Sequence, residues 1–244
     1  MRWRSLRHVG HLLSGVLLGV MVGGTALATD PRDYVTSHPA LDYFPAPSRD
    51  GRYLAFVSER SGNPDIWLRS LASGVVSLPR QVTTHPAVDR DPALNANGTQ
   101  LLYVSHKSDP RGDVYLMDLI TGQEQRLTDA RTGEALPQWG PAGQSVYYLK
   151  QEIGQLQYDL YRLSLPDRQE RKLLDQVSAY SVGPDGLIVL VREGLLYRVR
   201  DVQDERPVLL TSPPSVDSWP MVVDRTSVVF TRYLRDTNAD GHVD

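Results

Sequence analysis

The chain has no cysteine among its 244 residues. The chain therefore has no disulfide bond to stabilise it and no cysteine thiolate that could act as a nucleophile or metal ligand. The chain also has no excess of positive charge, because it contains 26 lysine and arginine residues and 29 aspartate and glutamate residues. A chain without a basic cluster is a poor candidate for binding nucleic acid or anionic lipid. The charge balance therefore argues against nucleic acid and anionic lipid as partners.

Long apolar runs are missing too, except at the N-terminus. Three arginines among the first seven residues precede an apolar stretch, Leu12 to Val22, and the small-residue sequence Ala26-Leu27-Ala28 follows it. This order predicts a secretory signal peptide over residues 1–28. An uncleaved membrane anchor is the alternative, but the stretch is shorter than the ~18 apolar residues of a spanning helix. We expect a periplasmic or secreted protein with no stable membrane insertion after cleavage, and a polar lead-in segment over residues 29–40.

Two catalytic motifs are absent from the sequence. It contains no G-x-S-x-G nucleophile elbow and no H-E-x-x-H zinc motif. The four histidines beyond the signal peptide (His38, His85, His106 and His242) are scattered. We therefore expect no enzyme, unless a catalytic domain follows residue 244.

What the sequence does contain is a repeat. The turn glycines Gly51, Gly98, Gly143 and Gly186 follow one another at intervals of 47, 45 and 43 residues. An apolar run follows each of these glycines. In the first three units, another segment that begins with an aspartate follows the apolar run. A period of ~40–50 residues with several short strands per unit is typical of a propeller blade.

Each unit is expected to contain four antiparallel strands. Glycine at the turn after the first strand supplies the positive φ that a tight hairpin needs. The dense apolar run of the second strand is typical of a strand buried on both faces. The sequence thus predicts an all-β fold, a β-propeller of four-stranded antiparallel blades over residues 41–244. About four and a half blades are present, so the propeller is incomplete and truncated in the fifth blade.

The third strand of each unit carries a recurring aromatic residue, and in three units an aspartate begins it. The aromatic residues are Trp67, Tyr115, Tyr161 and Tyr197, and the aspartates are Asp65, Asp113 and Asp159. The aromatic rings could form a platform on which a ligand stacks, but packing of blade against blade explains their position equally well. For the aspartates, acceptance of backbone or turn hydrogen bonds is favoured over catalysis.

These units resemble the WD40-like PD40 repeat of TolB-type β-propellers. Pro45 to Gly51 and Pro137 to Gly143 match the head of that repeat, and Asp65-Ile66-Trp67 and Arg126-Leu127-Thr128 match its later parts. The fourth unit has Gly194 where the aspartate is expected. The resemblance implies an exported propeller that binds other proteins, and a TolB-type propeller would have six blades. The same repeat also forms the regulatory propeller of prolyl-oligopeptidase-type serine hydrolases.

The C-terminal segment has the pattern of a calcium loop. It follows the D-x-[DN]-x-[DN]-G opening of an EF-hand-type loop, in which oxygen atoms at alternate positions point at one cation. The predicted calcium ligands are Asp236, Asn238, Asp240, His242 through its carbonyl group, and Asp244. Position 12 of the pattern would be residue 247. An Asn/Asp/Gly-rich hairpin without metal is the alternative.

Three functions are compatible with these observations. The favoured one is an exported scaffold that binds a protein partner in the cell envelope. The second is the regulatory propeller of a serine hydrolase whose catalytic domain is missing, and the third is a structural surface protein stiffened by calcium. If a cation or cationic partner is drawn to the propeller's funnel, the polar residues near the first strands would face it; otherwise they form a solvated rim. Those residues are Asp42, Thr84, His85, Asp89, Asp91, Asp129, Glu134 and Asp217.

Overall fold

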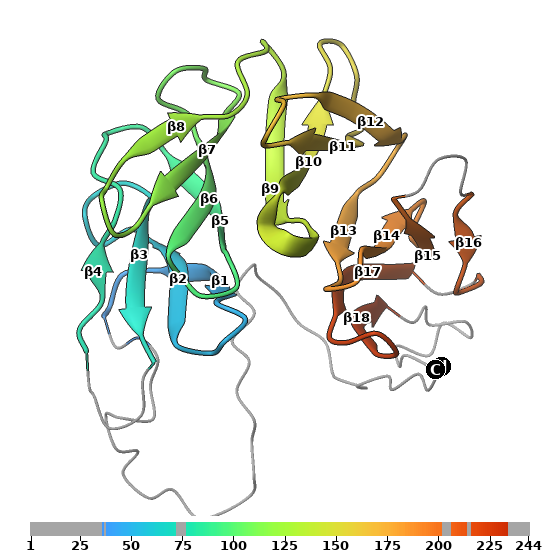
Figure 1. The fold of residues 1–244 in the computed structure, drawn as a ribbon, viewed down its shortest axis with the longest axis horizontal. Helices are drawn as coiled ribbons and strands as arrows, with labels where there is room; N and C mark the ends of the chain where they lie inside the picture. The colour runs from blue at the N-terminus through green and yellow to red at the C-terminus, as the bar shows by residue number, and fades with distance from the viewer. Residues whose placement is uncertain (1–35, 37, 72–76, 202–205, 214–215, 234–244) are drawn as a thin grey trace, which may run out of the picture. The chain divides into compact units, whose positions relative to one another are not determined.

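The structure is a computed structural model that describes residues 36, 38–71, 77–201, 206–213 and 216–233. The predicted signal peptide (1–28) and the predicted calcium loop (236–244) lie outside the described residues. The described chain forms four four-stranded antiparallel sheets and one two-stranded sheet (Figure 1). The predicted all-β propeller of four-stranded antiparallel blades is thereby confirmed.

In each four-stranded sheet the strands lie side by side in chain order, as in a propeller blade. The first sheet consists of β1 (Asp42–Pro47), β2 (Tyr53–Ser58), β3 (Asp65–Ser70) and β4 (Arg80–Gln81). The second consists of β5 (Asp89–Leu94), β6 (Gln100–Ser105), β7 (Asp113–Asp118) and β8 (Glu124–Arg126).

The later sheets repeat this order. The third consists of β9 (Gly133–Trp139), β10 (Ser145–Gln151), β11 (Asp159–Ser164) and β12 (Glu170–Leu174). The fourth consists of β13 (Ala179–Val182), β14 (Leu187–Arg192), β15 (Leu195–Arg200) and β16 (Val208–Leu209). The two-stranded sheet pairs β17 (Val216–Val222) with β18 (Val228–Tyr233), and a short 3-10 turn, η2 (Pro141–Gly143), follows β9.

The four turn glycines do what the sequence pattern predicts. Gly51, Gly98, Gly143 and Gly186 have φ values of 72°, 70°, 67° and 79°. At Gly98 a side chain is excluded for a second reason, because a Cβ atom there would lie 2.4 Å from Cδ2 of Tyr53. The second strands that follow these turns are buried on both faces, most completely in β6, β10 and β14.

A bulge in the first strand is a feature that the sequence did not reveal. Phe44, Asp91, Leu136 and Trp219 occupy equivalent places in β1, β5, β9 and β17, and all have φ values near +50°. In β1, β5 and β17 the pairing register with the second strand shifts at this point. One extra residue bends a strand and re-aims its side chains. The bulge therefore decides which polar groups of the first strand face the neighbouring sheet.

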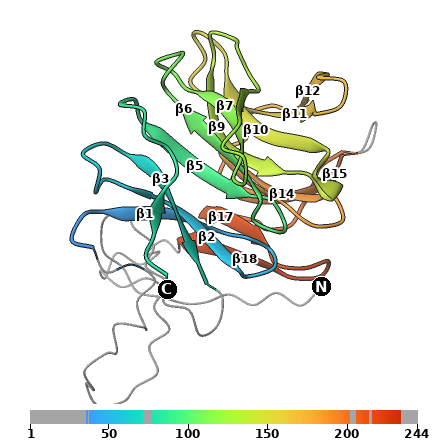
Figure 2. The ribbon, with the colours of Figure 1, turned by 60° about the vertical axis from the view of Figure 1, so that its left-hand side comes forward.

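The described residues fall into two compact units, one ending at Pro137 and the other beginning at Gln138. In the first unit, β5 packs against β1, β2 and β3 (Figure 2). Side chains from both sheets, including Ile66, Leu101 and Tyr103, form one buried apolar cluster there. Burial of such side chains contributes about 1.5–3 kcal/mol each.

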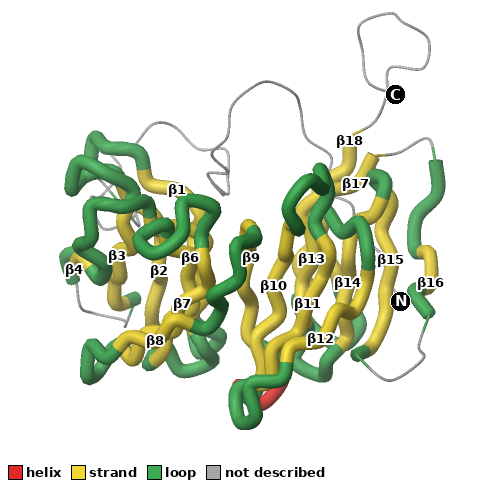
Figure 3. Tube along the Cα trace, turned by 90° about the horizontal axis from the view of Figure 1, so that it is seen from above, coloured by secondary structure: helices red, strands yellow, loops and turns green. Residues whose placement is uncertain are grey.

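In the second unit, β17 packs against β13, β14 and β15, which lie side by side in Figure 3. Val189, Leu196 and Val228 are buried together in this contact. Within the described ranges, no helix has the length and apolar character needed to cross a bilayer.

Candidate functional site

The aspartate that begins the third strand is buried and bound by the fourth strand. Asp65 accepts hydrogen bonds from the side chain of Gln81 at 2.9 Å and from Thr83 at 3.2 Å. Asp113 pairs with Arg126 at 2.9 Å, and Asp159 pairs with Lys172 at 2.9 Å. The aspartates are hydrogen-bond acceptors as predicted, but most of the donors are side chains and not the backbone or turn groups that were expected. Their partners are mainly side chains of the fourth strand, where the Arg-Leu-Thr motif lies.

The threonine of that motif has its own partner in three sheets. Its hydroxyl oxygen accepts a hydrogen bond from the backbone amide one residue after the start of the third strand, at 2.9 Å each time. The pairs are Thr83 with Ile66, Thr128 with Val114, and Thr211 with Leu196. Because the amides of Ile66 and Val114 are buried, the hydroxyl satisfies a donor that water cannot reach.

Most of the acidic residues predicted to face the funnel already have ion-pair or hydrogen-bond partners. Asp42 accepts two hydrogen bonds from Arg60, at 2.9 and 2.7 Å, and Asp217 accepts two from Arg232, at 2.7 and 3.1 Å. Glu134 is fully buried and accepts hydrogen bonds from Thr128 and Thr132. Asp42 and Asp217 are therefore neutralised within their own sheets, whereas Glu134 in β9 is bound by the segment that connects β8 to β9.

Asp91 and Asp89 have structural partners as well. Asp91 pairs with Arg90 and accepts the backbone amide of Leu136 at 3.1 Å, which links β5 to β9. Burial raises the pKa of Asp89, while hydrogen bonds from Ser105 and Thr83 act in the opposite direction. Burial is also the largest cause of the raised pKa of Asp113, and Arg126 opposes it. A buried carboxylate favours its neutral form unless a partner compensates.

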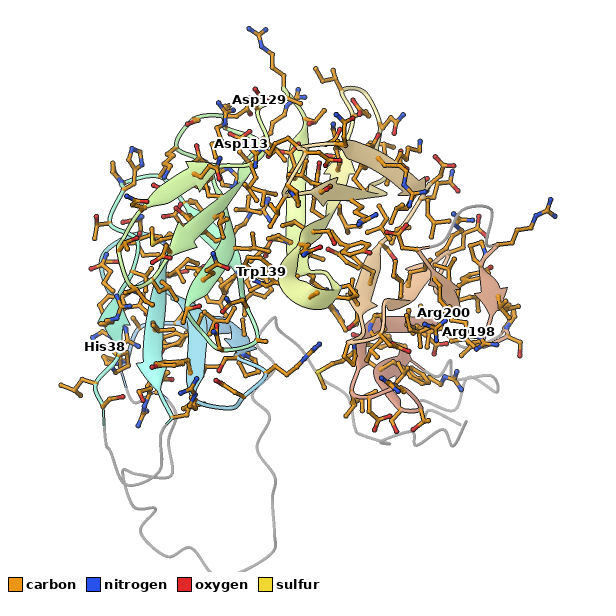
Figure 4. All side chains as sticks on the ribbon, viewed as in Figure 1. His38, Asp113, Asp129, Trp139, Arg198 and Arg200 are labelled. Atoms are coloured by element: carbon orange, nitrogen blue, oxygen red, sulfur yellow. The ribbon has the colours of Figure 1, made fainter. Side chains whose placement is uncertain are left out.

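Three of the predicted funnel residues are exposed: Thr84, His85 and Asp129. Figure 4 labels Asp129 and Asp113, which lie toward the same end of the first unit. Asp129 contributes to the raised pKa of Asp113 through charge repulsion. These three are the exposed members of the predicted set; Asp42 is partly buried, and the other four are buried.

Three of the four recurring aromatic residues, Trp67, Tyr115 and Tyr161, lie under a cation that the sequence pattern did not indicate. Tyr115 is buried in the apolar cluster between the first two sheets, so the packing interpretation is confirmed for it. The ammonium group of Lys107 lies 4.1 Å from the centre of its ring. Arg60 lies 4.7 Å from the centre of the Trp67 ring, and Lys150 lies 4.9 Å from that of Tyr161. Each cation occupies the ring face on which a ligand would stack.

Two histidines share a local motif, His-Pro-Ala, just before the first strands β1 and β5. Nδ1 of His38 accepts the amide of Ala40 at 3.1 Å, and Nδ1 of His85 accepts the amide of Ala87 at 3.0 Å. An imidazole whose Nδ1 accepts a hydrogen bond carries its proton on Nε2 when neutral. Each ring therefore caps its own turn, and in this geometry neither nitrogen offers a lone pair to a metal.

Within the described part of the chain, no group of three or more histidine, aspartate or glutamate side chains lies close enough to hold a metal ion. The predicted calcium ligands Asp236, Asn238, Asp240, His242 and Asp244 all fall outside that part. Calcium binding therefore stays a prediction.

The hairpin between β10 and β11 differs from the equivalent hairpins of the first two sheets. Its tip carries Ile153, with 64% of its surface exposed, and Leu156, with 95% exposed. A turn hydrogen bond from Gln155 to the carbonyl of Glu152, at 3.1 Å, holds the hairpin. The hairpins over residues 59–64 and 106–112 carry charged side chains instead. We therefore regard the tip at Ile153 and Leu156 as the candidate binding surface.

Comparison with known proteins supports the fold. The TolB β-propeller domain (PD40) matches residues 21–215. A putative TolB from Agrobacterium tumefaciens has 23% identity and a TM-score of 0.65, over 80% of this chain and 71% of that one. TolB from Acinetobacter baumannii has 20% identity and a TM-score of 0.60, over 72% of this chain and 45% of that one.

An enzyme shares this fold too. An oligogalacturonate lyase in complex with manganese has 17% identity and a TM-score of 0.61, over 79% of this chain and 58% of that one. No curated protein matches the sequence. At these identities the structural likeness concerns the fold alone, and the chain spans less than half of the Acinetobacter protein. The match to the family covers most of the sequence, and the chain belongs to the TolB β-propeller family.

Proposed function

We propose that the chain is an exported propeller that acts as a protein-binding scaffold in the cell envelope. The observation that carries this proposal is the pair of exposed aliphatic side chains at the β10–β11 hairpin, Ile153 and Leu156. Exposed apolar side chains gathered on a structured element are typical of a protein interface. Family membership and the predicted signal peptide support the envelope location.

The base of the hairpin is suited to presenting its tip. Lys150 pairs with Glu170 at 2.9 Å and lies over the ring of Tyr161, so it ties β10 to β12 and to β11. Tyr161 also donates a hydrogen bond to Glu152 at 3.5 Å. A tip on a fixed base loses less conformational freedom on binding than a loose loop does. The expected partner therefore offers an apolar pocket to Ile153 and Leu156.

Site-specific photo-crosslinking in intact cells tests this proposal. A photoreactive amino acid at position 156 should give one discrete adduct with an envelope protein. The matched control position is 78, because Leu78 is 87% exposed but lies on a different loop. Equal labelling at both positions, or no adduct at position 156, would contradict a binding role for the hairpin.

We also propose that the segment from Asp236 to Asp244 binds calcium. Its side chains supply carboxylate and amide oxygens at alternate positions, which suit a hard cation. The test is thermal unfolding of the full chain with calcium and with a chelator, in the wild type and in Asp236→Ala, which removes the aspartate at the first position of the pattern. A calcium-dependent rise in melting temperature that the variant lacks supports the site, and an equal response in both excludes it.

The proposal is of binding and not of catalysis. The hydrolase alternative would add a catalytic domain after residue 244, and the oligogalacturonate lyase illustrates that enzymes also use this fold. An activity-based serine-hydrolase probe applied to the native gene product separates the two. Labelling of that product would favour the hydrolase, whereas a crosslinked partner without labelling favours the scaffold.

A further inference from the structure

Arg90 joins three elements of the first unit. It lies in β5, beside the bulge residue Asp91, and its guanidinium group pairs with the Asp91 carboxylate. Its Nη2 donates to the backbone carbonyl of Glu134 in β9 at 3.0 Å. Its Nε donates to Nε2 of His106, at the start of the hairpin between β6 and β7, at 3.1 Å. One side chain thus holds β5, β9 and this hairpin together.

The protonation of His106 follows from its two neighbours. A guanidinium group only donates hydrogen bonds, so Nε2 of His106 must accept from Arg90 and carries no proton. Nδ1 lies 2.9 Å from the carbonyl oxygen of Pro110, which only accepts, so Nδ1 carries the proton. The contacts therefore require the neutral imidazole in its Nδ1–H form.

Other contacts hold the ring in place. The backbone amide of His106 donates to Val88 at 3.0 Å, just before β5. Gly112 lies against the ring, and a Cβ atom there would be 3.2 Å from Nε2 and 2.7 Å from Val104. The amide of Glu134 donates to the carbonyl of Gly112 at 3.2 Å, which links the end of the hairpin to β9. Displacement of the ring would therefore disturb both ends of this hairpin.

We propose that His106 and Arg90 form a pH-sensitive joint that loosens the hairpin of residues 106–112 from β5 and β9 in mild acid. Protonation of His106 puts a proton on Nε2, which then faces the N–H group of Arg90. Two donors and two positive charges meet where one hydrogen bond existed, so the contact breaks. Imidazole is the ordinary side chain whose charge changes between pH 5 and 8, so this is the range in which the joint is tested.

The charged groups on the surrounding elements do not supply a replacement partner. The nearest are Asp89 and Asp91 on β5, Lys107, Asp109 and Arg111 on the hairpin, Asp113 on β7, and Glu134 on β9. Asp89 has hydrogen bonds from Ser105 and Thr83. Asp91 is paired with Arg90, Asp113 with Arg126, and Glu134 is hydrogen-bonded to two threonines. Asp109 accepts the amide of Arg111 at 2.8 Å, and Lys107 pairs with Glu124. An imidazolium at position 106 therefore faces carboxylates that already have partners.

Hydrogen exchange of the full chain at pH 7.5 and pH 5.5 tests the joint. The reporters are the amides of His106, Gly112 and Glu134, and the amide of Val114 is the internal reference. After correction for the intrinsic pH dependence of exchange, the protection of the three reporters should fall about tenfold in acid, as expected of local opening. The protection of Val114 should stay unchanged.

His106→Gln is the matched variant, because the glutamine carbonyl can accept from Arg90 and cannot be protonated in this range. In this variant the three reporters should lose their pH dependence, whereas His85→Gln should behave as the wild type. The same pH dependence in His106→Gln and in the wild type would overturn the proposal. So would nitrogen NMR of the wild-type ring at pH 7.5 if it placed the proton on Nε2, and this measurement needs no variant.

Discussion

The hydroxyl oxygen of Thr128 lies 2.9 Å from the amide nitrogen of Val114 and accepts its hydrogen bond. Thr83 makes the same contact with Ile66, and Thr211 with Leu196. The threonine of the Arg-Leu-Thr motif is therefore a structural residue whose hydroxyl group links the end of the fourth strand to the start of the third. The third sheet has Leu174 in place of the threonine, and there the amide of Gln176 donates to Asp159 at 3.0 Å.

Replacement of this threonine should be costly. Thr128→Val keeps the shape of the side chain but leaves the buried amide of Val114 without an acceptor, so we expect a loss of about 1–3 kcal/mol in the free energy of unfolding. Thr121→Val is the control, because the hydroxyl of Thr121 is exposed; it donates to Asp118 at 3.0 Å and accepts the amide of Gln123 at 3.3 Å. Chemical denaturation of both variants measures the difference. Equal losses of unfolding free energy in the two variants would show that the buried Thr128 contact stabilises the fold no more than an exposed one.

The pair of Asp113 and Arg126 gives a second prediction. Asp113 is fully buried, so Arg126→Met leaves a buried charge without its cation and should cost about 3 kcal/mol of unfolding free energy. The double variant Asp113→Asn, Arg126→Met removes that charge and should recover most of the loss. Chemical denaturation of the single and double variants measures both changes in unfolding free energy. A double variant less stable than Arg126→Met would contradict it.

Two turn glycines separate the effect of backbone conformation from that of close packing. Gly51 and Gly98 have nearly equal φ values, but only Gly98 lies against another side chain, Tyr53. Gly51→Ala should cost about 1–2 kcal/mol from the left-handed conformation alone. Gly98→Ala should cost more, because Tyr53 must also move. Equal melting temperatures for the two variants would show that Tyr53 yields freely.

Asp50 should contribute to stability in a defined acid range. A hydrogen bond from Ser48 is the largest cause that lowers its pKa to about 2. Because its pKa in the folded chain lies below the unfolded value of about 3.9, the contribution is present above pH ~4 and is lost as the pH falls through ~2. Asp50→Asn should therefore flatten the fall in melting temperature between pH 4 and pH 2. An unchanged slope in the variant would contradict this assignment.

The strand arrangement could be predicted from the sequence because each repeat places the same residue types at the same positions, and those types suit a turn, a buried strand or a hydrogen bond. The turn glycines mark the hairpin between the first two strands, and the apolar runs after them become strands buried on both faces. The third-strand aspartates were also correctly interpreted as hydrogen-bond acceptors. Each of these features depends on neighbours within one sheet, which a periodic sequence pattern reports directly.

The polar groups of the first strand could not be predicted in the same way. Their direction depends on a bulge at Phe44, Asp91, Leu136 and Trp219, where residues other than glycine adopt positive φ. Such residues carry no sequence signature. The partner of Asp42, Arg60, is 18 positions away, and its pairing follows from the strand register and not from a motif. For these reasons the partners of these acids could not be read from the sequence.

The most direct test of the proposed scaffold role is calorimetry with the partner identified by crosslinking at position 156. The double variant Ile153→Asp, Leu156→Asp should weaken binding at least about tenfold, which corresponds to about 1.4 kcal/mol. Leu78→Asp, equally exposed but on another loop, should bind as the wild type does. Unchanged affinity in the double variant, or the same loss in Leu78→Asp, would contradict the assignment of the β10–β11 hairpin as the binding surface.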